Sequence, residues 1–142
     1  MLLAAALLAA AAPLPPGRPA PGSYKAGQVW EYRTRPGDEG SLLKIQKVDR
    51  AGANGLREPI YHVSVIGFHL ANPRIRPVLS HAPFAKAALE ASLTRPSPLR
   101  PAFPDAVPGI VQWQQTKGGV YTVPVAQVID MLDQTTRNMG AE

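Results

Sequence analysis

Hydrophobic and polar positions alternate with a period of two in three stretches of the first half of the chain. The first, 28–34, places its aromatic side chains on one face and its charged side chains on the other, which predicts a half-buried strand. A second strand is expected at 41–48, and the six-residue polar connector 35–40 predicts a hairpin between the two. The run 60–70 is apolar on both faces, as in a central strand that is covered on both sides.

The second half of the chain shows helical spacing interrupted by prolines. Apolar residues lie four apart in 84–93, which predicts a helix, whereas the prolines that follow it exclude regular structure. A short helix is expected at 110–116 and a short strand at 120–123. After Pro124, apolar residues recur at i, i+3, i+4 and i+7, which predicts a final helix.

The order of these elements places hairpin strands first and helices afterwards. This order predicts an α+β fold, with a three- to four-stranded, mainly antiparallel sheet and two to three helices packed on it. The chain has 142 residues, which fits one domain. We expect this domain to span 23–138, followed by a tail at 139–142.

The N-terminal segment reads as an export signal followed by a spacer. Residues 2–12 are Leu and Ala without interruption, a length typical of a signal peptide and too short for a membrane-spanning helix. Five prolines within 13–22 predict an extended tether. We therefore expect a signal peptide and Pro-rich tether over 1–22, a periplasmic or secreted protein, and no transmembrane helix in its mature form.

Composition excludes several classes of function. The chain has no cysteine, so disulfides, thiolate metal sites, thiol catalysis and a lipoprotein anchor are ruled out. Its net charge is +5, but the basic residues are dispersed along the sequence and do not cluster as a nucleic-acid groove requires. This dispersal predicts no nucleic-acid partner. Phosphate-binding glycine loops are absent from the sequence, so we expect no nucleotide cofactor.

The three histidines show no metal-binding spacing such as H-x-H or H-E-x-x-H. A site can still assemble in space from His62, His81 and either Asp38 or Glu39. This set carries the alternative function, a metal-dependent or other small enzyme. Structural histidines are the preferred interpretation, so we assign no catalytic residue, no metal and no cofactor.

Two carboxylate pairs are the remaining candidates for acid–base chemistry. Asp38 and Glu39 lie in a glycine-flanked turn, and Asp130 and Asp133 are i, i+3 neighbours on the expected wet face of the last helix. Neither setting predicts the burial that raises a carboxyl pKa for acid catalysis. We therefore expect both pairs to be solvated.

The most distinctive run of the sequence is Gly27-Gln28-Val29-Trp30-Glu31-Tyr32-Arg33-Thr34-Arg35-Pro36-Gly37-Asp38-Glu39. Together with 41–42, 60–65, 72–73 and 81–84, this run resembles a family of small, uncharacterised bacterial proteins. The resemblance extends over about 25–133, and the chain departs from it in the leader and in a Pro-rich stretch at 95–108. The resemblance implies a shared fold unit and assigns no catalytic residues.

The dense mixed charge on the connector beside a Trp/Tyr strand favours recognition over catalysis, since loops often carry function. We therefore expect a non-enzymatic binding or interaction module of the cell envelope with a protein partner, and an immunity-type or inhibitor protein is one such form. The sequence leaves the oligomeric state open. The expected binding residues are Arg33, Arg35, Asp38, Glu39, His62 and His81.

Overall fold

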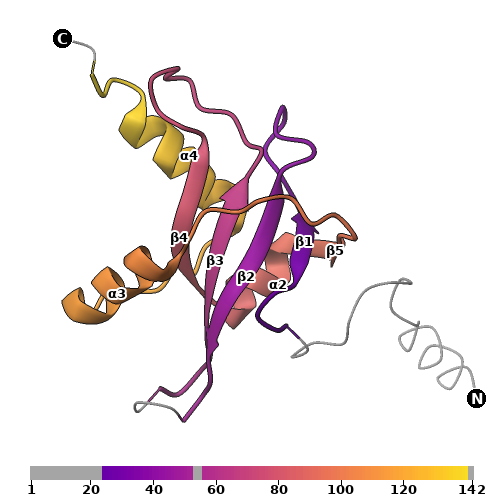
Figure 1. The fold of residues 1–142 in the computed structure, drawn as a ribbon, viewed down its shortest axis with the longest axis vertical. Coiled ribbons are helices and arrows are strands. Elements are labelled where there is room, and N and C mark those ends of the chain that lie inside the picture. The colour runs from indigo at the N-terminus through magenta and orange to yellow at the C-terminus, as the bar shows by residue number, and fades with distance from the viewer. Residues whose placement is uncertain (1–23, 53–55, 141–142) are drawn as a thin grey trace, which may run out of the picture.

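The computed structural model describes residues 24–52 and 56–140, so the expected signal peptide and tether lie outside the described residues. The described chain forms a five-stranded antiparallel sheet in the order β4-β3-β2-β1-β5, with three helices (Figure 1). The strands are β1 (Val29–Tyr32), β2 (Leu42–Asp49), β3 (Ile60–Ile66), β4 (Val78–Ala85) and β5 (Leu93–Pro96). The helices are α2 (Lys86–Ser92), α3 (Val107–Thr116) and α4 (Val125–Thr136). The α+β fold is confirmed, but the predicted three to four strands are too few.

The two strands that the sequence did not predict are the edges of the sheet, and each contains a proline. Pro83 lies inside β4 and Pro96 ends β5. An edge strand has one side free of partner strands, so the missing proline N–H is tolerated there. The helix predicted at 84–93 is correspondingly shorter, because Phe84 and Ala85 belong to β4.

The prediction of a short strand at 120–123 is wrong. Only Tyr121 pairs with the sheet, through a single parallel bridge to Phe84. Its N–H donates to the carbonyl of Pro83 (2.9 Å), and its own carbonyl accepts the N–H of Ala85 (3.0 Å). One residue therefore covers the open edge of β4 beside the proline.

One face of the sheet packs against α2 and α4 and forms the hydrophobic core. The stripe predicted for the last helix is confirmed, since Val125, Val128 and Ile129 are all buried in α4. The sheet contributes large side chains that alternate along its strands, as the pattern of period two requires. The largest of these are Trp30, Leu43, Ile45, Val63, Val65 and Phe84.

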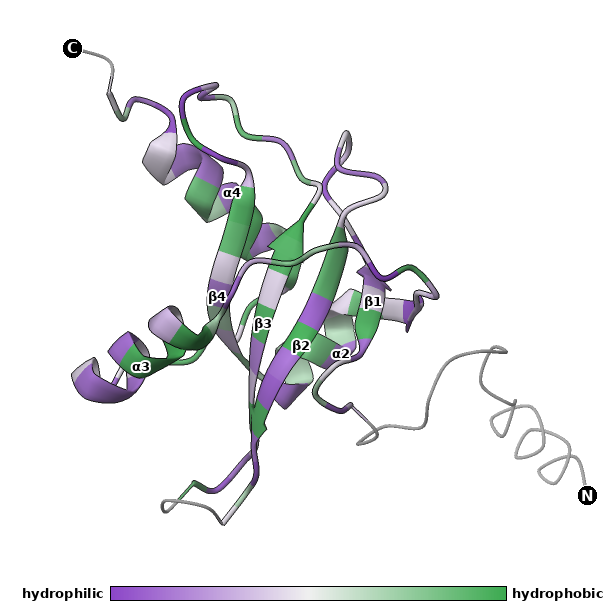
Figure 2. Cartoon of the chain, viewed as in Figure 1, coloured by the Kyte–Doolittle hydropathy of each residue, from purple (hydrophilic) through white to green (hydrophobic). Residues whose placement is uncertain are grey.

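The opposite face of the sheet is polar and is covered by different elements. The Pro-rich chain between β5 and α3 crosses in front of the strands, and α3 lies beside β4 (Figure 1). Polar positions alternate with apolar ones along β2 (Figure 2). Gln46 on this face donates to the hydroxyl of Ser64 (3.1 Å) and to the carbonyl of Pro104 (3.2 Å). The central strand β3 is therefore covered on both sides, as predicted. Helices α2 and α4 cover one face, and the Pro-rich chain and α3 cover the other.

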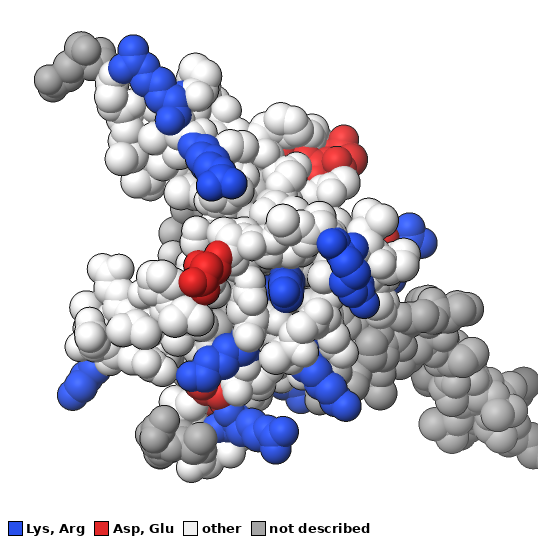
Figure 3. Space-filling view, in the orientation of Figure 1, with Lys and Arg blue, Asp and Glu red and all other residues white. Residues whose placement is uncertain are grey.

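Charge is spread thinly over this second face. Lys and Arg side chains stand singly among uncharged residues, without a continuous basic area (Figure 3). Within the described ranges, no helix is long and apolar enough to cross a membrane.

Candidate functional site

The connector between β1 and β2 folds back on itself through two tight turns. The N–H of Asp38 bonds to the carbonyl of Arg35 (3.0 Å), and the N–H of Ser41 bonds to the carbonyl of Asp38 (3.0 Å). Gly37 and Gly40 have φ values of 94° and 93°, a left-handed conformation that favours glycine. These turns direct the side chains of Arg35 and Asp38 inward.

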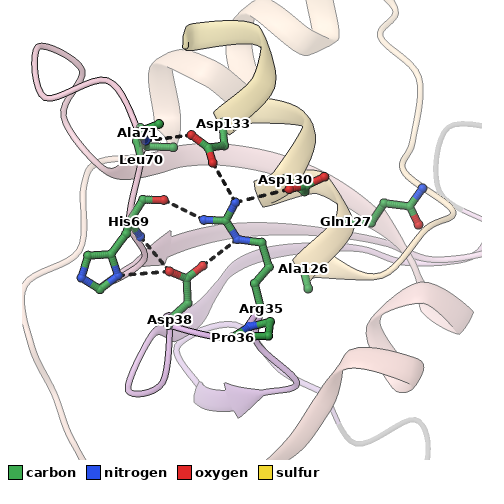
Figure 4. A pocket seen from close by; sticks show the side chains of 11 residues that line it. Arg35, Pro36, Asp38, His69, Leu70, Ala71, Ala126, Gln127, Asp130 and Asp133 are labelled. Atoms are coloured by element: carbon green, nitrogen blue, oxygen red, sulfur yellow. Dashed lines mark hydrogen bonds and ion pairs between the residues drawn. The ribbon is translucent and has the colours of Figure 1, made fainter.

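Arg35 is the centre of a cluster that joins three parts of the chain (Figure 4). Its Nε donates to Asp38 Oδ2 (2.8 Å) and its Nη1 donates to Asp133 Oδ2 (3.1 Å). Its Nη2 donates to the carbonyl of His69 (2.6 Å), and Asp130 Oδ1 lies 3.5 Å from Nη1. We call these five residues the Arg35 cluster.

The two inner carboxylates of this cluster are also bonded by backbone N–H groups. Asp38 Oδ1 accepts the N–H of His69 (2.9 Å), and Asp133 Oδ1 accepts the N–H of Ala71 (2.8 Å). Burial opposes ionisation of Asp38, but bonds from Arg35 and His69 outweigh it and lower the pKa of its carboxyl. The N–H of Ala71, and then Arg35, lower the pKa of Asp133. Both groups therefore stay ionised and paired.

The expectation that both carboxylate pairs are solvated is wrong for one member of each. Asp38 is 2% exposed and Asp133 is 8% exposed, because Arg35 neutralises them inside the cluster. Glu39 is exposed and accepts the N–H of Gly37 (2.7 Å), and the side chain of Asp130 is 49% exposed. An open groove of about 850 Å³ lies over the cluster, between the connector and α4.

A second polar network lies on the other face of the sheet. His62 in β3 is completely buried, and its Nε2 lies 2.8 Å from Asp49 Oδ2 at the end of β2. Its Nδ1 lies 2.8 Å from Nε2 of His81 in β4. The two rings stack with their centroids 5.1 Å apart. We call Asp49, His62 and His81 the histidine chain.

The carboxylate at one end sets the direction of the hydrogen bonds along this chain. Burial opposes ionisation of Asp49, but His62 and Lys47 outweigh it and lower the pKa of the carboxyl. An ionised carboxylate only accepts, so His62 carries its proton on Nε2 and, when neutral, accepts at Nδ1. Nε2 of neutral His81 is then the donor. Nδ1 of His81 is left as an unprotonated acceptor.

His81 stays neutral over a wide pH range. Burial, followed by the charge that His62 gains when protonated, lowers the pKa of His81 to about 4. Within the described residues, Nδ1 of His81 has no hydrogen-bond partner, and it is not among the fully buried unpaired atoms. This nitrogen is therefore not fully buried, and it lies beside Gly109, which lines the first hollow described below together with His81.

Trp113 in α3 covers the buried end of the network. Its ring packs edge-on against His62, with centroids 4.9 Å apart, and its Nε1 donates to the carbonyl of Gly119 (2.9 Å). Two glycines permit this packing: a Cβ at Gly109 would lie 2.6 Å from the Cβ of His81, and one at Gly118 would meet Trp113. The helix therefore lies close against both rings.

Three hollows open around Trp113, with volumes of about 380, 520 and 350 Å³. We call them the first, second and third Trp113 hollows. His81 lines the first and third, whereas Asp49 lines the second. These volumes lie at the lower end of the range for small-molecule sites. The open nitrogen of His81 thus lies where a ligand has room.

The structure divides the sequence-predicted site residues between two places. Arg35 and Asp38 lie in the Arg35 cluster, while Arg33 and Glu39 are exposed on the same connector. His62 and His81 meet each other, but they contact Asp49 and not the connector carboxylates. Across the described part of the chain, no group of three or more His, Asp or Glu side chains is placed to hold a metal ion.

Sequence reasoning missed two residues of the second network. Asp49 directly follows the predicted strand 41–48 and ends the observed β2, a position where a carboxylate resembles any polar strand end. Trp113 lies in the predicted helix 110–116 and reads as an ordinary apolar position. The spacing of the histidines carried no sign of either contact.

No family model, no curated protein and no solved structure matches the chain. The resemblance of the run 27–39 to a bacterial family therefore stays a prediction.

Proposed function

We propose that this chain is a non-enzymatic binding module of the cell envelope, and that its ligand, or a side chain of its partner, enters the Trp113 hollows. One observation carries the proposal. Three hollows share a single half-buried tryptophan, and His81 between them offers a ring nitrogen that is fixed in position and unpaired among the described residues. Binding sites commonly combine aromatic walls with a few polar groups of fixed orientation.

The Arg35 cluster is a weaker candidate, because its groups are already bonded to one another. All three nitrogens of Arg35 are bonded, and its side chain is 18% exposed. A partner would have to break these bonds before it could bind the guanidinium. We therefore propose that Arg35 and Asp38 stabilise the fold. Of the two predicted histidines, His81 is the binding residue, and the buried His62 orients it.

Binding is favoured over catalysis because two hydroxyl groups near the histidine chain, those of Ser64 and Thr116, are bonded elsewhere. The Ser64 hydroxyl donates to the carbonyl of Ser80 (2.6 Å) and accepts from Gln46. The Thr116 hydroxyl donates to the carbonyl of Gln112 (2.9 Å). Covalent catalysis needs a nucleophile within hydrogen-bond reach of its base. Neither hydroxyl is bonded to His81.

An enzyme is the second candidate, and the histidine chain itself favours it. A proton taken up at Nδ1 of His81 can be matched by transfer of the Nε2 proton to His62. The positive charge then lies on His62 beside the carboxylate of Asp49. Such a chain suits a general base that activates water. In this version Asp49 takes the place that was predicted for Asp38 or Glu39.

The envelope location and the protein partner belong to the same proposal. The signal peptide predicted at the N-terminus is the basis for the location, and a small domain that engages one partner fits an immunity-type or inhibitor protein. Trp and Tyr are enriched at the energetic centres of protein interfaces. Trp113 and the partly exposed Tyr121 both line the third hollow.

The test is native mass spectrometry of the protein purified from its own host, as wild type and as three variants. We expect a bound ligand or partner that is lost from Trp113→Ala and His81→Phe but kept by Arg33→Ala, whose site is exposed on the connector. NMR spectra of each variant would verify folding. An occupant kept by both hollow variants and lost from Arg33→Ala would contradict the proposal. Turnover of an added substrate that depends on His81 would instead favour the enzyme.

A further inference from the structure

We infer that the ligand of the Trp113 hollows is neutral and polyhydroxylated, of the saccharide class. This inference rests on the proposed function, since it names the chemistry of what that site would bind. It is carried by the composition of the first and third hollows, both of which are lined by His81, the residue with the unpaired nitrogen. The first is lined by Ser80, His81, Gly109, Gln112, Trp113 and Thr116. The third is lined by His81, Pro83, Trp113, Gly119, Val120 and Tyr121.

Charge is the first argument. Among the described residues that line these two hollows there is no Lys, Arg, Asp or Glu, although the chain as a whole carries 25 such residues, 15 basic and 10 acidic. An anionic ligand would find no cationic side chain there. A neutral ligand loses no ion pair on binding, so these walls suit it best.

The polar atoms of the first hollow are the second argument. His81 presents Nδ1 as an acceptor when its chain is neutral, and the exposed Gln112 amide offers both donors and an acceptor. The exposed Ser80 adds a hydroxyl that donates or accepts. Hydroxyl groups on a ligand match such mixed partners, because each one can donate and accept at once.

The aromatic rings are the third argument. Nε1 of Trp113 is bonded to Gly119, so the ring offers its apolar surface to the hollows, and Tyr121 adds a second ring that is 36% exposed. The C–H faces of a sugar ring are apolar, while its hydroxyls point outward from the rim. A flat aromatic wall beside hydrogen-bonding groups accommodates both parts of such a ligand.

A cationic ligand is the strongest competitor, because ammonium groups pack over indole rings. Among the described residues that line the three hollows, Asp49 is the only carboxylate, and it lines only the second hollow. It is already bonded to His62 (2.8 Å) and paired with Lys47 (3.3 Å). A cation in the first or third hollow would therefore face neutral groups.

The experiment is an NMR titration of the full chain with five separate probes: glucose, N-acetylglucosamine, chitobiose, choline and inorganic phosphate. We expect at least one saccharide to shift the Trp113 indole signal, with the buried Trp30 indole as an internal reference. His81→Phe should weaken that binding about five- to tenfold, as loss of one hydrogen bond predicts. Trp113→Ala should weaken it more than tenfold, and Gln115→Ala, exposed on α3 and outside both hollow linings, should leave it unchanged.

The outcomes separate this inference from the proposed function. If choline or phosphate shifts Trp113 and no saccharide does, the saccharide class is wrong while a binding site at Trp113 stands. The same holds if only a co-purified protein shifts it. If no probe shifts Trp113 and the native protein carries no occupant there, both proposals fail.

Discussion

The Arg35 cluster and the histidine chain are both networks of partly or fully buried polar groups, and each pairs an aspartate with a histidine. They differ in how they end. In the cluster, one guanidinium bonds to two carboxylates and a carbonyl, and backbone N–H groups occupy the remaining oxygens of those carboxylates. The histidine chain runs from Asp49 through His62 to His81. It stops at Nδ1 of His81, which is unpaired among the described residues and belongs to a side chain that lines a hollow.

This difference separates a structural network from a binding one. A buried network in which every group is bonded stabilises the fold and offers nothing to a ligand without first breaking. A network with one open end has both an orientation and an unpaired atom. Judged by burial and charge alone, the Arg35 cluster would be the stronger candidate for a binding site. The histidine chain, however, ends at a nitrogen that is unpaired among the described residues, and this favours His81.

The largest expected effect is on stability, at Arg35. Arg35→Met should reduce the free energy of unfolding by about 3–5 kcal/mol, because Asp38 would be left buried without its cation. Among the described residues, the only cation left to Asp133 would be Arg137, at a longer distance from its Oδ2 (3.6 Å). Urea denaturation would measure it. Arg33→Met, two positions earlier and exposed, should change stability by less than about 0.5 kcal/mol. Equal small losses in the two variants would show that the cluster does not hold the fold.

The next effect is a loss of stability in acid that originates in the histidine chain. Folding lowers the pKa of His81 from 6.5 to about 4, so the unfolded chain binds its proton more readily. Stability should then fall by roughly 1–3 kcal/mol as the pH falls from 6.5 to 4. The pKa values of three carboxyl groups, those of Asp38, Asp49 and Asp133, are also lowered by folding. Their contributions to the free energy of unfolding are therefore lost only below that pH window.

Denaturation curves at several pH values would measure this decline. In His81→Phe the slope within that window should flatten, whereas Arg35→Met should retain it. A wild-type stability that is constant across the window would contradict the assigned role of His81.

The smallest expected effect on stability comes from the close packing of α3 against the histidine chain. Replacing a helical glycine by alanine normally stabilises by about 1 kcal/mol. At Gly109 the new Cβ would lie 2.6 Å from the Cβ of His81, so we expect a loss of about 1–2 kcal/mol instead. Gly119→Ala has open space and should be nearly neutral. Thermal melts would compare the two, and a more stable Gly109→Ala would show that α3 moves away freely.

The central part of the fold could be predicted from the sequence because its signals are local. Alternation in 28–34 and 41–48 and the stripe after Pro124 each depend on neighbours within a few residues, and each element is present. The edge strands β4 and β5 were missed because their prolines are breakers in a local pattern. Only the position of these strands at the sheet edges makes proline acceptable.

The sites were less predictable because their contacts join distant parts of the sequence. Arg35 and Asp133 are 98 positions apart, so an aspartate that looked solvated on its helix is buried against the connector. Asp49 and His62 are 13 positions apart, and they meet only because a register shift in the β2–β3 pairing follows Ile45. No spacing rule on one strand anticipates such a shift.

The most direct test of this account is the protonation state of the two ring nitrogens of His81. Long-range ¹H–¹⁵N NMR at neutral pH would assign the tautomer of each histidine ring. The account predicts that His62 and His81 both carry their proton on Nε2, which leaves Nδ1 of His81 as an acceptor at the Trp113 hollows. A proton on Nδ1 of His81 at neutral pH would contradict it, because the hollow would then face a donor and the chain would have no open acceptor.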